Sequence, residues 1–168
     1  MILSQYKVQF LNGPLADVQR WSVHPAFLCG GSIIDAADWK GLQAPPFGCS
    51  YVINLEQEHS DQGKGIADLL EIPRPDDGSP RPAEWFQNAW RFAREKVASG
   101  QRGYLHCQAG GSRTPAMLYY FLRKLGYSQA DALAFIRQDR PAFGVHSYHV
   151  AYIASAEAAL RPFSGVPQ

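Results

Sequence analysis

The sequence predicts an α/β fold of three layers, in which a central, mostly parallel sheet of four to five strands carries helices on both faces. Short apolar runs rich in β-branched residues, without polar alternation, indicate strands that are covered on both faces. These runs alternate with longer segments of helical periodicity, which is typical of a parallel sheet with crossover helices. The 168 residues, 46% hydrophobic and 18% charged, suit one globular domain, so we expect a single domain over 1–168.

The strands are predicted from short apolar runs that end at glycine, proline or polar clusters. The run at 50–55, Ser-Tyr-Val-Ile-Asn-Leu, is the clearest of them because it does not alternate between apolar and polar residues. Polar and proline-rich residues predict loops at 56–65 and 73–82. The predicted strands cover 8–11, 23–28, 50–55, 68–72 and 104–106.

Helices are predicted where apolar residues recur at helical spacing or where capping residues mark a start. Asp35 is a candidate cap for the first helix, and Ser128 with Asp131 resembles a capping box. Pro115 suits the first turn of a helix because its missing N–H is not needed there. The predicted helices cover 33–42, 83–99, 112–125, 128–139 and 147–160.

The charge balance argues against several classes of partner. Lys and Arg number 16 against 15 Asp and Glu, so the formal net charge of +1 lacks the basic excess of a nucleic-acid-binding protein. The same balance predicts weak attraction to anionic membranes, and no apolar run approaches the roughly 20 residues of a membrane span. The N-terminus shows no signal-peptide pattern, so we expect a cytoplasmic protein that binds neither nucleic acid nor membrane.

The three cysteines are too few and too scattered for a disulfide framework or a metal site. They favour a reducing compartment, and we expect neither a metal nor an organic cofactor. Cys29 and Cys49 are predicted to be small buried hydrophobic residues. A protective disulfide between one of them and an oxidised Cys107 stays open.

The segment 106–114, His-Cys-Gln-Ala-Gly-Gly-Ser-Arg-Thr, joins a predicted strand to a predicted helix. Its small residues allow a tight curl in which successive backbone N–H groups point inward and, with the helix N-terminus, cradle an anion. Gly110 and Gly111 are expected to adopt positive φ and to let the backbone approach a ligand closely. The phosphate-binding residues predicted from this curl are Gln108, Ala109, Gly110, Gly111, Ser112 and Arg113.

Cys107 lies at the base of the predicted cradle, where the local field favours an ionised, nucleophilic sulfur. Arg113, six positions on, is long enough to fold back over the cradle and hold two phosphate oxygens with its planar fork. Its charge would also stabilise the oxygens of a phosphoryl group in transfer. The hydroxyl of Thr114, or that of Ser112, is a candidate donor to the sulfur that would make it a better leaving group.

His106-Cys107, five residues and then Arg113-Thr114 resemble the H-C-x5-R-[S/T] signature of the cysteine-based protein-tyrosine and dual-specificity phosphatases. The resemblance implies a phosphatase-like fold and a phosphomonoester hydrolase that works through a phosphocysteine intermediate, without a metal. In that family the His before the Cys orders the loop, which is the role implied for His106. The longer chain and phosphotyrosine-recognition loop of the large tyrosine-specific enzymes are not found here, so the compact dual-specificity branch fits better.

The family supplies a general acid from a loop about 30 residues before the Cys. The segment 75–80, Pro-Asp-Asp-Gly-Ser-Pro, resembles the Pro-Asp-x-Gly-x-Pro acid loop of compact members. That alignment favours Asp76, but some relatives with two adjacent aspartates use the second, so Asp77 stays a near-equal alternative. The competing interpretation is an ordinary polar turn, in which Asp before Gly is common.

The cradle side chains are neutral, which favours a singly phosphorylated group such as phosphotyrosine over a multiply phosphorylated inositol. The expected partner is therefore a phosphorylated protein or peptide, and the expected state is a monomer. Alternatives are an inactive module that binds phosphorylated partners, and a phosphatase of a phosphoinositide or nucleotide cap. A sulfur-transfer or arsenate-reducing enzyme is a third alternative, but it calls for other loop spacing or extra redox cysteines.

Four further residues lie close in sequence to the predicted site. His146 and His149 are expected to be helix-start residues, with a place on the rim of the cleft as the alternative. Arg74 and Arg81 flank the acid loop and are expected to be solvated loop charges, with contact to an anionic substrate as the alternative.

Overall fold

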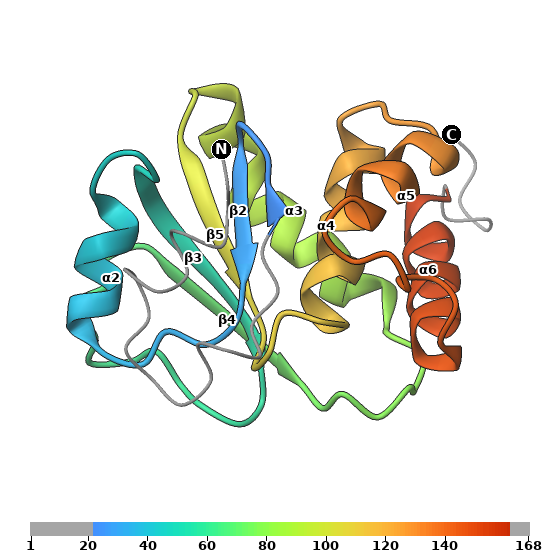
Figure 1. The fold of residues 1–168 in the computed structure, drawn as a ribbon, viewed down its shortest axis with the longest axis horizontal. Coiled ribbons are helices and arrows are strands. Elements are labelled where there is room, and N and C mark those ends of the chain that lie inside the picture. Colours follow the sequence, from blue (N-terminus) through green and yellow to red (C-terminus); the bar gives the residue numbers. More distant parts are fainter. Residues whose placement is uncertain (1–21, 162–168) are drawn as a thin grey trace.

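The computed structural model describes residues 22–161 and shows a five-stranded sheet between two layers of helices (Figure 1). The strand order is β1-β2-β5-β3-β4; β1 is antiparallel to β2, and the remaining pairs are parallel. The strands are β1 Ser22–Val23, β2 Phe27–Gly30, β3 Cys49–Glu56, β4 Leu69–Arg74 and β5 Arg102–His106. The predicted fold class is confirmed, while the strand predicted at 8–11 lies outside the described residues.

The two faces of the sheet are covered unequally (Figure 1). The helices are α2 Ala36–Gln43, α3 Ala83–Ala98, α4 Arg113–Lys124, α5 Gln129–Arg137 and α6 Ser147–Leu160. Helix α2 covers one face, where Leu28, Val52 and Tyr104 belong to the smaller buried cluster. The other helices cover the opposite face, where the adjacent Ile53 and Leu105 join the larger cluster. This alternation along each strand is what a sheet buried on both faces requires.

The prediction of one strand over 23–28 is wrong, because the chain forms a tight hairpin there. His24 and Phe27 exchange two backbone hydrogen bonds across the turn, with N···O distances of 2.8 and 3.2 Å. Pro25 lies inside this turn and has no N–H to donate to a ladder, so a continuous strand is disfavoured.

Strand β4 extends further than predicted and includes Pro73, which was expected to begin a loop. Strand β4 is the last strand of the sheet, so a missing N–H at Pro73 can face away from the ladder. The loop predicted at 56–65 also begins later, because Glu56 is the last residue of β3. Both cap predictions are confirmed: the side chains of Asp35 and Ser128 accept bonds from the backbone N–H three residues on.

The topology places the loop after β5 at the centre of the molecule. Strand β5 lies between β2 and β3, and the helix that follows, α4, is buried from Arg113 to Leu122. In open parallel sheets, ligands bind at the carboxyl ends of the strands. The segment that carries Cys107 therefore begins where such a site is expected.

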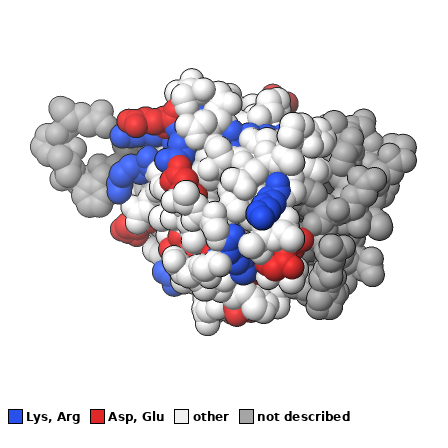
Figure 2. All heavy atoms as spheres, turned by 90° about the vertical axis from the view of Figure 1, so that its left-hand side faces the viewer, with Lys and Arg blue, Asp and Glu red and all other residues white. Residues whose placement is uncertain are grey.

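Charges of both signs are scattered among uncharged residues on the face that α2 covers (Figure 2). This face shows no broad area of a single sign. Within residues 22–161, none of the helices combines the length and apolar character needed to cross a membrane.

Candidate active site

The cradle loop, residues 107–112, links the end of β5 to the start of α4. Cys107 is 2% exposed and lies at its base. Gly110 has a φ of 77°, a conformation in which a side chain would be strained. The expectation of positive φ at Gly111 is wrong: its φ is not in this region, and a Cβ there would meet no atom within 4 Å.

Two carbonyl groups of the cradle loop are held by hydrogen bonds from other segments of the chain. The backbone N–H of Ser32 donates to the Gln108 carbonyl at 3.0 Å, and Arg140 Nε donates to the Gly110 carbonyl at 2.7 Å. A trans peptide unit points its C=O and the next N–H in opposite directions. The N–H groups of Ala109 and Gly111 consequently point away from Ser32 and Arg140, which is the orientation that an anion cradle needs.

Helix α4 begins immediately after the cradle loop. Ser112 occupies its N-cap position, but the Ser112 side chain makes no capping hydrogen bond and instead bonds His149 Nε2 at 3.0 Å. The first N–H groups of α4 are thus left for an anion.

Thr114 places its hydroxyl beside the sulfur. Thr114 Oγ1 lies 3.0 Å from Cys107 Sγ and 3.2 Å from the Gly30 carbonyl. A hydroxyl has one proton, so it can be donated to the sulfur when the sulfur is charged and to the carbonyl otherwise. Of the two hydroxyls considered from sequence, the structure brings that of Thr114 to the sulfur.

Arg113 is 3% exposed and is fixed at one end of its guanidinium. Its Nη1 donates to Glu58 Oε2 at 2.9 Å and to the Arg74 carbonyl at 2.7 Å. Burial lowers the pKa of Arg113, but the bond to Glu58 and the charges of Cys107 and Asp76 raise it above its usual value. Arg113 Nε is buried and has no acceptor among the described residues. A buried donor of this kind needs an acceptor, and a phosphate oxygen fits it.

Behind the cradle, His106 belongs to a buried charge network. Its Nε2 lies 2.5 Å from Asp61 Oδ2, and its Nδ1 lies 3.1 Å from the Cys107 carbonyl. Both ring nitrogens face acceptors, so a protonated imidazolium donates to both. Burial lowers the pKa of His106, yet the bond to Asp61 outweighs it and the pKa is raised. Lys64 Nζ contacts the other Asp61 oxygen at 3.0 Å, which completes the network.

The acid loop is held by α6 and by Arg81. Tyr152 Oη donates to Asp76 Oδ1 at 2.9 Å, and the Gly78 N–H donates to Tyr152 Oη at 3.0 Å. Arg81 is 4% exposed; its guanidinium stacks on the Tyr152 ring, 4.3 Å from the centroid, and donates to the Pro75 carbonyl at 2.5 Å. The expectation that Arg81 is a solvated loop charge is wrong.

The two candidate acids differ in their surroundings. Asp77 Oδ1 accepts from the N–H and the hydroxyl of Ser79 at 2.9 and 2.6 Å, which lowers the pKa of Asp77. Asp77 therefore closes the turn of the loop. The charge of Asp76, in contrast, acts on both Arg113 and His149. Asp76 thus acts electrostatically on two residues beside the cradle, while Asp77 is engaged within its own turn.

The two other cysteines lie in the interior of the protein. Cys29 and Cys49 are buried and free, and burial raises the pKa of each thiol to about 12. Neither is a nucleophile at neutral pH. No group of three His, Cys, Asp or Glu side chains suited to a metal ion occurs in the part of the chain that the structure describes.

Comparison with known families decides the identity of this arrangement. The family model described as "Dual specificity phosphatase, catalytic domain" matches residues 41–158, which include the acid loop, the cradle loop and His149. The chain belongs to the dual-specificity phosphatase family. The solved structure of human DUSP28 has a similar fold.

The curated relatives of this dual-specificity phosphatase domain are longer proteins. The mouse dual specificity protein phosphatase 2 is 31% identical over 115 residues, covering 68% of this chain and 36% of that protein. The Drosophila melanogaster dual specificity protein phosphatase Mpk3 is 28% identical over 140 residues, covering 82% and 34%. The chain thus spans about a third of the length of these relatives. The crystal structure of human DUSP28 superposes with a TM-score of 0.66 at 19% identity, covering 82% and 96%.

Several residues that hold the site were not found from sequence. Arg140 and Tyr152 contact the cradle loop and the acid loop, and Glu58 and Asp61 bond the flanking residues Arg113 and His106; all four come from segments far away in the chain. Single polar residues in loops carry no local sign of such contacts. The polar run at 56–65, predicted only as a loop, supplies both carboxylates.

We predict that Asp61→Asn destabilises the protein by about 3 kcal/mol, because it leaves a buried imidazolium without its carboxylate. Burial alone would raise the pKa of Asp61, but the bonds to His106 and Lys64 outweigh burial, so the pKa is lowered. Because the pKa of Asp61 is lowered, its carboxylate stabilises the fold at pH values above the ordinary pKa of 3.8. Because the pKa of His106 is raised, its contribution to stability is complete at pH values below the ordinary pKa of 6.5. Urea unfolding should show the largest loss in the free energy of unfolding for Asp61→Asn between pH 3.8 and pH 6.5.

The matched control is Asp68→Asn. Asp68 pairs with Lys96 at 3.3 Å while its side chain is 42% exposed, so its loss should cost less than about 1 kcal/mol. Equal losses for the two variants would contradict the claim that Asp61→Asn leaves an uncompensated charge buried in the protein.

Proposed function

We propose that the chain is a cysteine-dependent phosphatase that hydrolyses phosphomonoesters on protein through a phosphocysteine intermediate. One observation carries the proposal: the Thr114 hydroxyl lies 3.0 Å from the buried sulfur of Cys107, at the start of the cradle loop. The unpartnered Arg113 Nε at the same loop supports it, because this donor suits a phosphate oxygen.

In the first step, Cys107 Sγ attacks phosphorus and forms the S–P bond while the P–O ester bond breaks. The departing ester oxygen keeps the electron pair and takes a proton from Asp76. The amides of 108–112 and the Arg113 guanidinium stabilise the charge on the three equatorial oxygens. Tyr152, which bonds Asp76, holds the acid in place.

In the second step, a water oxygen attacks phosphorus and the S–P bond breaks, returning its electron pair to sulfur. The Asp76 carboxylate takes the proton of the water and is ready for the next cycle. The Thr114 hydroxyl donates to the sulfur as negative charge returns to it. A compartment that keeps Cys107 reduced, as expected for the cytoplasm, suits this chemistry.

The neutral side chains of the cradle support a singly phosphorylated protein residue as the substrate. Gln108, Ala109 and Ser112 add no charge that could meet a second or third phosphate. A phosphoinositide or nucleotide cap is less well matched for this reason. An inactive binding module has no need of the aligned Cys107, Arg113 and Asp76 set.

We predict that Cys107→Ser abolishes turnover of p-nitrophenyl phosphate while binding of a phosphotyrosine peptide persists. The assay contains EDTA and reductant, and vanadate should block the wild-type protein. Full turnover by the variant would exclude Cys107 as the nucleophile. Wild-type protein that binds the peptide but never turns over either substrate would favour the binding module.

We predict that Asp76→Ala slows turnover of a phosphotyrosine peptide by roughly 10²–10⁴, because the poor leaving group then departs unprotonated. Asp77→Ala is the matched control and should lose less than tenfold, since Asp77 closes the turn. For p-nitrophenyl phosphate, whose leaving group needs no proton, the loss in Asp76→Ala should be far smaller. The reverse order of the two variants would assign the acid to Asp77.

A further inference from the structure

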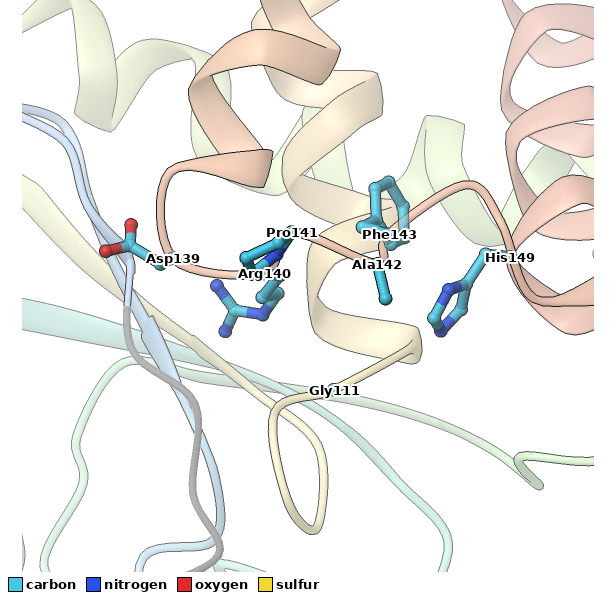
Figure 3. A pocket seen from close by; sticks show the side chains of 7 residues that line it. All are labelled: Gly111, Asp139, Arg140, Pro141, Ala142, Phe143 and His149. Atoms are coloured by element: carbon cyan, nitrogen blue, oxygen red, sulfur yellow. The ribbon is translucent and has the colours of Figure 1, made fainter.

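A pocket of about 340 Å³ lies directly beside the cradle loop. Gly111 of the cradle loop forms one side, residues 139–143 between α5 and α6 form another, and His149 of α6 closes it. Figure 3 shows Gly111 on its loop, with Ala142 and His149 directed into the space next to it. We call this space the side pocket.

The side pocket is fixed to the cradle by two hydrogen bonds. Arg140 Nε donates to the Gly110 carbonyl at 2.7 Å, and Ser112 Oγ bonds His149 Nε2 at 3.0 Å. Gly111 lies between these two anchored residues, so it belongs to the cradle loop and also lines the side pocket. A phosphorylated residue bound in the cradle would thus bring its chain neighbours to the side pocket.

The lining of the side pocket is mostly apolar. Pro141 and Ala142 contribute exposed carbon surface, and Phe143, which is 1% exposed, packs behind them. The imidazole of His149 packs on the Phe143 ring with centroids 5.0 Å apart. Burial, together with nearby His146, lowers the pKa of His149, so the imidazole is uncharged at neutral pH.

Exposed apolar side chains occur close to His149 in the chain. Five large hydrophobic side chains are exposed among residues 22–161, and three of them are Val145 at 76%, Tyr148 at 37% and Val150 at 53%. All three lie in the loop and first turn of α6 that carry His149. Exposed apolar side chains gathered next to a polar site mark contact with a partner.

We propose that the side pocket binds an apolar side chain of the substrate protein, next to the phosphorylated residue. This inference rests on the proposed phosphatase function and adds a sequence preference to it. The cradle would bind the phosphoryl group, and the side pocket would bind one neighbouring side chain.

A second phosphate is the main rival occupant. The charged groups do not favour it: Arg140 already gives Nε to the Gly110 carbonyl and Nη1 to Ser22 Oγ. Asp139 lines the same pocket with a carboxyl group, which repels an anion when ionised. An apolar side chain needs no free cation and is not repelled by the Asp139 carboxylate.

The test compares kcat/KM for phosphotyrosine peptides in a serine background. Leu, Glu, Lys or phosphothreonine is placed singly at each of the two positions on either side of the phosphotyrosine. The wild-type protein should prefer Leu over Ser roughly tenfold at one of these positions, the usual gain from filling an apolar pocket. The same ratio is then measured in three variants.

Ala142→Leu fills the side pocket and should bring the Leu-to-Ser ratio close to one. Ala142→Asp, at the same exposed position, should lower the ratio and raise the preference for Lys. The matched control Ala134→Leu makes the same change on an exposed part of α5 outside the pocket and should keep the tenfold ratio.

A wild-type protein that turns over p-nitrophenyl phosphate but shows no Leu preference would overturn this inference and leave the proposed function intact. A preference for phosphothreonine would overturn it in favour of a second phosphate. Retention of the Leu preference in both Ala142 variants would also overturn it. Absence of turnover with every substrate would remove the proposed function and this inference with it.

Discussion

The anchoring of two cradle carbonyls is the constraint on which the site depends. Ser32 N–H and Arg140 Nε hold the carbonyls of Gln108 and Gly110, so the following N–H groups point away from these two donors. A loop without these anchors would be free to turn its carbonyls inward and repel an anion. The start of α4 at Arg113 adds further N–H groups at the same place. The chemistry proposed for the sulfur follows from this arrangement of amides.

Buried ionic groups surround the cradle, and each is held by partners from other segments. Arg113 is fixed by Glu58, and His106 by Asp61. Arg81 holds the acid loop against the ring of Tyr152. Such pairs contribute little net stability, because desolvation offsets the attraction between the charges. Their effect is to fix geometry, so that a catalytic group is already in place when the substrate arrives.

The sequence was sufficient where the relevant contacts are local. The strand–loop–helix order around Cys107 follows from small residues in a turn and from helical periodicity after it, and the structure has it. The hairpin at Pro25 was missed, because its turn is closed by the pairing of His24 with Phe27 rather than by a local apolar pattern. The extension of β4 through Pro73 was missed, because the effect of a proline on a strand depends on whether that strand lies at an edge. The partners Asp61 and Tyr152 lie 45 and 76 positions from the groups they bond. Contacts at such separations leave no local pattern in a single sequence.

The most direct test of the account is a crystal of the protein soaked in tungstate, which mimics the phosphoryl group. We predict an oxyanion roughly 3.5 Å from Cys107 Sγ, ringed by the amides of 108–112 and bonded by Arg113 Nε. That Arg113 bond should form while the ion pair to Glu58 persists. An oxyanion bound elsewhere, with the cradle carbonyls turned inward, would contradict the central claim.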